Sequence, residues 1–141
     1  HSILMNGVCS DAGIYRNHAV RITGVNLPPA HYMSVPKLMS EVMARIAEKT
    51  KDAIVLSASV HSKFEQIHPF SDGNGRVGRL LMNAMLLSAN FAPAIIRQER
   101  KRLYYTYLYK AQTKNDQSQL ENFLCDAVTD GFKILERTDV R

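Results

Sequence analysis

Apolar side chains recur at helical spacing through most of this chain, from about residue 36 to residue 137. The first stripe lies within 36–49, where Pro36 suits the opening position of a helix. Its apolar members are Leu38, Met39, Val42, Met43, Ile46 and Ala47. The same spacing predicts four further helices, over 52–67, 74–88, 97–113 and 117–137. The pattern therefore predicts an all-α body.

The helices predicted over 52–67 and 74–88 are apolar on nearly every side, which is typical of helices buried in a core. Asp52 stands where a side chain can accept hydrogen bonds from the first turn of the earlier helix. Pro69 disfavours helical geometry at His68, so that helix should end there. We therefore expect two core helices to enclose a short loop that begins at His68.

The N-terminal part of the chain follows a different pattern. Val20 and Ile22 alternate with Arg21 and Thr23, which is the two-residue period of a β-strand. A glycine follows and offers a turn. The pattern predicts a small β-hairpin within about 14–27.

Composition limits the class of protein. The chain has 141 residues, which suits a single domain over 1–141. Hydrophobic residues make up 45% and charged residues 22%, so a disordered or fibrous chain is excluded. No apolar run approaches the ~20 residues that span a bilayer, so we expect no membrane association. Because the chain starts at His1 without an initiator methionine, we expect a segment of a longer protein.

The net charge of +5 suits an anionic ligand, and the loop 68–79 offers a site for one. Its sequence is HPFSDGNGRVGR. Gly73 and Gly75 allow the backbone to turn tightly and to approach a ligand. The loop opens into a helix, whose first N–H groups and positive dipole end attract anions. Arg76 and Arg79 share one face of that helix, and guanidinium groups bind phosphate oxygens in pairs.

Two further side chains of the loop supply chemistry. Asp72 is a carboxylate beside the anion site, and Mg²⁺ is commonly held by one or two carboxylates together with substrate phosphates. His68 is a candidate general base. Taken singly, each feature has an ordinary structural interpretation: a turn, a helix-end histidine, a solvated arginine. Together, within twelve residues, they indicate transfer of a phosphate-containing group.

The loop resembles the signature of the Fic family, His-Pro-Phe-x-Asp/Glu-Gly-Asn-Gly-Arg-x-x-Arg, at every fixed position. The resemblance extends over roughly 12–137 and implies a Fic-type helical core with a β-hairpin flap over the active site. It further implies a protein adenylyltransferase, which transfers AMP from ATP to a Tyr, Thr or Ser hydroxyl and releases pyrophosphate. His68 would be the base, and Asp72 would hold Mg²⁺, with Mn²⁺ as a substitute. The residues implied for the phosphates are Gly73, Asn74, Gly75, Arg76 and Arg79.

The resemblance also implies contacts outside the loop. Val20, Arg21, Ile22 and Thr23 of the flap would dock the target protein as an added strand, although a plain surface hairpin has the same pattern. Tyr104 and Tyr105 would line the adenine pocket. Neighbours on a helix point about 100° apart, so at most one should stack on the base, and core packing is the alternative.

The identity of the donor and the mode of action leave alternatives open. In a subfamily that phosphorylates translation factors, lysine replaces the glycine at position 75, so Gly75 favours AMP transfer. Other relatives transfer different nucleotides or phosphocholine, and a full-length protein with an inhibitory glutamate could remove AMP. A nucleotide-binding module without activity is a further alternative, and nucleic-acid binding is a weaker one.

Family members are commonly restrained by a helix with the pattern Ser/Thr-x-x-x-Glu-Gly/Asn, whose glutamate pairs with the second arginine of the loop, here Arg79. The chain contains one Glu-Asn pair, at Glu121, but Gln117 stands where Ser or Thr is required. We therefore expect the inhibitory helix upstream of His1 or on a separate antitoxin chain. By resemblance we also expect a homodimer and a bacterial cytoplasmic location. We expect no zinc site.

Overall fold

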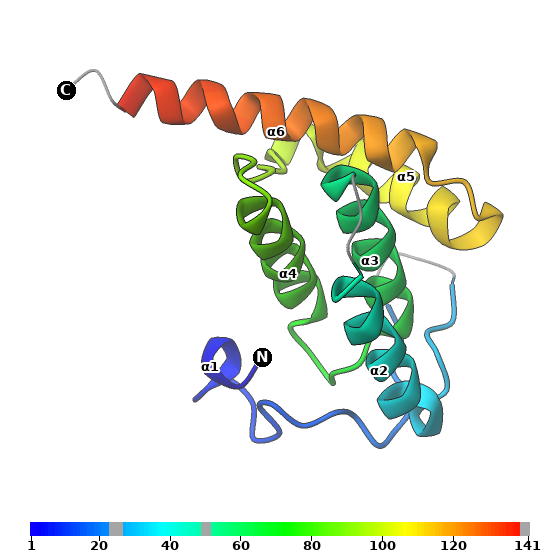
Figure 1. Cartoon of the computed structure of the whole chain (residues 1–141). Coiled ribbons are helices and arrows are strands. Elements are labelled where there is room, and N and C mark those ends of the chain that lie inside the picture. The colour runs from blue at the N-terminus through cyan, green and yellow to red at the C-terminus, as the bar shows by residue number, and fades with distance from the viewer. Residues whose placement is uncertain (23–26, 49–51, 139–141) are drawn as a thin grey trace.

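The computed structural model describes residues 1–22, 27–48 and 52–138, and no strand occurs among them (Figure 1). All five predicted helices are present, so the all-helical prediction is confirmed. The elements are α1 (Ser2–Met5), η1 (Tyr32–Ser34), α2 (Val35–Ile46), α3 (Ala53–Ile67), α4 (Asn74–Ser88), η2 (Gln98–Arg100), α5 (Lys101–Lys114) and α6 (Ser118–Thr138).

Helix α3 lies at the centre, with α2 and α4 on its flanks and α5 and α6 packed across one end (Figure 1). Asp52 caps it as predicted, because one carboxylate oxygen accepts from the backbone N–H groups of Ile54 and Val55, each at 3.0 Å. The helix ends at His68, whose φ of 52° is left-handed. The predicted stop before Pro69 is therefore confirmed.

Two apolar clusters share α3. Val60, Phe64 and Ile67 pack against α2 and Phe70, while Ala58 faces α4, α5 and α6. Burial of a side chain as large as Phe64 stabilises the fold by about 2 kcal/mol. The cluster that contains Ala58 also buries the large side chains of Met82, Leu86, Tyr104, Leu108, Leu120, Phe123 and Leu124.

Helix α4 departs from the prediction that it is buried on all sides. Leu80 and Leu87 are 56% and 54% exposed. The buried residues of α4 follow a four-residue spacing, which is one stripe of a helix that packs on a single neighbour. They are Asn74, Gly78, Met82 and Leu86. The outer half of α6 is similarly open, with Phe132 and Leu135 exposed.

The predicted hairpin is not seen in the residues that the structure describes. Residues 14–22 and 27 carry no strand, and 23–26, which include Thr23 and the predicted turn, lie outside the described residues. The hairpin therefore stays a prediction.

Arg16 fastens the N-terminal segment to the end of α3. Its side chain is only 4% exposed, and its guanidinium donates to the carbonyls of His68 (2.7 Å), His18 (2.8 Å), Ala30 (2.5 Å) and Ile67 (3.2 Å). Its backbone N–H donates to the Pro69 carbonyl at 2.9 Å. These contacts pair carbonyl groups at the end of α3 that have no partner within the helix.

None of the described helices is both long enough and apolar enough to cross a lipid bilayer.

Replacing Arg16 with alanine should lower the free energy of unfolding by about 3 kcal/mol, because buried carbonyls lose charged donors. Urea unfolding followed by circular dichroism measures the change. Arg102→Ala, at an exposed position of α5, is the matched control and should change stability by less than about 0.5 kcal/mol. Equal effects of the two variants would contradict the role given to Arg16.

Candidate active site

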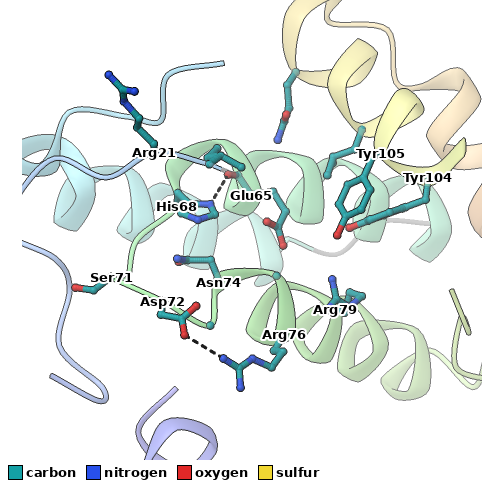
Figure 2. Close-up of a pocket in the computed structure, with 15 residues that line it drawn as sticks. Arg21, Glu65, His68, Ser71, Asp72, Asn74, Arg76, Arg79, Tyr104 and Tyr105 are labelled. Carbon is teal, nitrogen blue, oxygen red and sulfur yellow. Dashed lines mark hydrogen bonds and ion pairs between the residues drawn. The ribbon is translucent and has the colours of Figure 1, made fainter. Parts of the chain in front are cut away.

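A cavity of about 400 Å³ lies where α3 ends and α4 begins (Figure 2). It is bounded by the ends of α3 and α4, by α5, and by Arg21 and Ile22 of the N-terminal segment. Among the residues predicted from the sequence, the cavity brings together His68, Asp72, Gly73, Asn74, Gly75, Arg76, Arg79, Tyr104, Tyr105, Arg21 and Ile22. Val20 is not among its lining residues.

The loop before α4 is held in one conformation by Gly73 and Asn74. Gly73 has a φ of 78°, and a Cβ there would lie 2.8 Å from the Met5 sulfur, so a larger residue would strain the turn. The buried Asn74 amide bridges Phe70, accepting from its N–H at 2.9 Å and donating to its carbonyl at 2.8 Å. The Asn74 side chain is thus engaged within the loop, and only its backbone N–H is left for a ligand.

The start of α4 presents backbone donors to the cavity. The first α4 hydrogen bond runs from the Val77 N–H to the Gly73 carbonyl, and no described side chain caps the helix. The N–H groups of Asn74, Gly75 and Arg76 precede that bond. Such free donors are able to bind an anion, and the predicted anion site stays a prediction.

His68 is oriented by the backbone of its own helix. Its Nδ1 lies 3.3 Å from the Glu65 carbonyl, which can only accept, so Nδ1 carries the proton and Nε2 has a free electron pair. Burial, reinforced by the charge of Arg16, lowers the pKa of His68 from its ordinary value. The imidazole is therefore neutral near pH 7 and able to accept a proton.

The two arginines occupy different depths. Arg76 is at the mouth, where it lies 3.3 Å from an Asp72 oxygen in an exposed pair. Such a pair contributes little to stability and can open to a ligand. Arg79 is half-buried over Gly75, where a Cβ would lie 3.2 Å from its guanidinium. A side chain at position 75 would therefore disturb Arg79.

The tyrosines predicted for an adenine pocket differ in exposure. Tyr104 is 1% exposed, and its hydroxyl lies 2.6 Å from Nε2 of the fully buried His61. It packs in the core and also lines the cavity. Tyr105 is 42% exposed at the cavity wall and retains a free face. Burial lowers the pKa of His61 to about 4, so this histidine is a neutral packed residue.

Sequence reasoning missed Glu65. It lies one turn before His68 and points into the cavity, with only 8% of its surface exposed (Figure 2). Burial raises the pKa of its carboxyl to about 7, although the positive charge of Arg79 opposes the rise. A charged residue in a helix is usually on the surface, and the three-residue spacing from His68 was the available signal.

The described residues contain no group of three or more His, Cys, Asp or Glu side chains that could hold a metal ion. Asp72 is the one carboxylate at the cavity mouth among them, and its side chain is 69% exposed. A single accessible carboxylate fits a cation whose other ligands are phosphate oxygens and water.

Comparison with known proteins agrees with this geometry. The sequence model of the Fic/DOC family matches residues 1–86, which include the whole loop. The chain belongs to the Fic/DOC family.

Several relatives of this Fic chain are named for one activity. It is 40% identical to protein adenylyltransferase Fic of Nematostella vectensis over 72% of the chain and 24% of that protein. It is 37% identical to a probable protein adenylyltransferase of Aquifex aeolicus over 70% of the chain and 30% of that protein. It thus spans about a quarter of the length of these curated relatives.

A solved structure shares the Fic fold at full coverage of the chain. A Fic family protein from Desulfovibrio desulfuricans superposes with a TM-score of 0.83 at 31% identity, covering 100% of this chain and 46% of that one.

The Asn74 amide should matter for the Fic loop beyond its effect on stability. Asn83 offers a matched control, because its amide bridges the Ala94 backbone in the same way, away from the cavity. Asn74→Ala and Asn83→Ala should each lower the unfolding free energy by about 2 kcal/mol. At temperatures where both variants stay folded, only Asn74→Ala should weaken ATP binding, measured by calorimetry. Equal weakening in both would show that the loop has no special dependence on Asn74.

Proposed function

We propose that this Fic domain is a protein adenylyltransferase that transfers AMP from ATP to a hydroxyl of a target protein. The observation that carries the proposal is the free Nε2 of His68, which shares one cavity with the backbone donors of α4 and with Arg79. A cavity of about 400 Å³ suits a nucleotide-sized ligand. The names of the relatives from Nematostella and Aquifex support the same activity.

In this proposal His68 acts as general base. Its Nε2 takes the proton from a Tyr, Thr or Ser hydroxyl while the hydroxyl oxygen forms a bond to the α-phosphorus. The bond from that phosphorus to the bridging oxygen breaks, and pyrophosphate leaves with the electron pair. The N–H groups of Asn74 and Gly75, together with Arg76 and Arg79, hold the phosphates and stabilise the charge of the leaving group.

Asp72 would hold Mg²⁺, or Mn²⁺ in its place, at the cavity mouth. When bound, the cation supplies positive charge to the phosphates. Arg76, which pairs with Asp72 at 3.3 Å, then becomes free to turn to the nucleotide.

Gly75 supports AMP transfer over phosphoryl transfer. A lysine there would place its Cβ 3.2 Å from the Arg79 guanidinium, so Arg79 would have to shift. A glycine instead leaves Arg79 available to the terminal phosphates. The second candidate function is transfer of another nucleotide or of phosphocholine, or removal of AMP by a longer protein. These reactions would use the same residues.

The target protein would dock beside the cavity. Arg21 and Ile22 reach the cavity wall, and we propose that they and Val20 and Thr23 form the flap that pairs with the target segment. The same proposal includes an inhibitory helix or antitoxin that acts on Arg79. It also includes a homodimer and a cytoplasmic location. A β-hairpin flap over the cavity would complete the fold.

The proposed chemistry predicts which phosphate of ATP labels the target. With Mg²⁺ present, label from α-³²P-ATP should appear on the domain itself or on a lysate protein, and label from γ-³²P-ATP should not. His68→Ala should reduce the transfer by about 10²–10⁴-fold. Transfer of the γ-label would overturn AMP transfer, and transfer of neither label would favour another donor or a binding module.

The rate should depend on the protonation of His68. Because burial lowers its pKa, the rate at saturating ATP should rise with pH, with a midpoint below pH ~6.5, and should be flat from about pH 7.5 to pH 8. Single-turnover labelling across this range measures the midpoint. A midpoint above pH ~7 would contradict the assignment of a neutral, buried base.

A further inference from the structure

The Glu65 carboxyl is buried in the wall of the nucleotide cavity, and the residue is only 8% exposed. Its Oε1 is buried and has no hydrogen-bond partner within the described part of the chain. That oxygen lies against Gly78 of α4, where an added Cβ would clash with it. An unpartnered buried polar group costs about 1–3 kcal/mol, so its retention calls for a partner that the free protein does not provide.

The surroundings of Glu65 favour its neutral form. His61, on its own helix, is uncharged, and the buried Tyr104 hydroxyl faces it from α5. From α4 the nearby cation is Arg79, but no ion pair joins the two in the described structure. His68 carries no charge near neutral pH, and Asp72 and Arg76 pair with each other at the mouth. The carboxyl is thus shielded from water without a contacting counter-charge, and its pKa rises to about 7.

A neutral carboxyl carries one O–H donor. A ligand bound in the cavity can accept the hydrogen bond from this O–H. The carboxyl points toward the space between His68, Asn74 and Arg79 (Figure 2). Arg79 and the first N–H groups of α4 make that space a site for phosphate oxygens, which are acceptors. An ionised Glu65 would instead repel a phosphate across this low-dielectric space.

We infer that Glu65 is a nucleotide-binding residue that donates a hydrogen bond, as the neutral acid, to a phosphate oxygen of ATP. The inference rests on the proposed function, because it requires the phosphates to lie in this cavity. Binding of ATP then captures a proton whenever Glu65 was ionised in the free protein. Above neutral pH the affinity for ATP falls as the pH rises, by up to about tenfold per pH unit.

A structural role for Glu65 makes a different prediction. A carboxyl that only fills space beside Gly78 or attracts Arg79 would change stability or affinity when replaced, but it would not link ATP binding to a proton. The number of protons taken up per bound ATP therefore separates the two roles.

The test is calorimetry of ATP binding, with excess Mg²⁺, in buffers that differ in their enthalpy of ionisation. The slope of the observed heat against that enthalpy is the number of protons taken up. All measurements use a His68→Ala background. This substitution prevents turnover and removes His68 as an alternative proton acceptor. At about pH 7.5 we expect uptake of more than about half a proton per ATP, because a group with a pKa of about 7 is mostly ionised there.

Glu65→Gln in the same background keeps the shape of the side chain and a donor group but cannot titrate. It should abolish the uptake and make ATP affinity independent of pH between about 7 and 9. Glu65→Leu serves the same purpose if the amide does not fold, and thermal melting checks both variants.

The outcomes separate the inference from the proposed function. Uptake that persists in Glu65→Gln, or ATP binding without uptake in the background protein, would overturn the role of Glu65 and leave the nucleotide site intact. Absence of ATP binding in the background protein, confirmed as folded, would overturn the proposed function together with the inference.

Discussion

The buried guanidinium of Arg16 is the contact on which the site's geometry depends. It gathers the carbonyls of Ile67 and His68, at the end of α3, with those of His18 and Ala30 in the N-terminal segment. A helix that ends beside a cavity leaves carbonyls without partners, and here one side chain pairs them. The left-handed turn at His68 is thereby held, and the imidazole is fixed against its own backbone.

Charge in the cavity is arranged by depth. Burial opposes the charged forms of the innermost titratable groups, so His61 and Tyr104 are neutral near pH 7 and Glu65 is partly protonated there. The arginines are closer to solvent, so the cavity presents positive charge to an incoming anion. Such an arrangement suits phosphate groups and limits the charge that is placed in the core.

Local sequence accounts for much of the fold. Periodicity identified the five long helices, Asp52 the start of α3, and Pro69 its end, because each rests on interactions within a few residues. Periodicity failed for α4, where Leu80 and Leu87 are exposed although the sequence is apolar all round. Whether an apolar face is covered depends on which elements are available to cover it, and no local pattern contains that information.

The sequence by itself determined which functional groups the loop 68–79 brings together. These groups are neighbours in the chain, so they are close in space in any fold. It also determined family membership, which the match over residues 1–86 shows. Tertiary structure decided which tyrosine is buried, what Arg16 holds, and that Glu65 faces the cavity. Those properties arise from contacts between residues 43 to 52 positions apart or from loss of water, and desolvation becomes known only when the chain is packed.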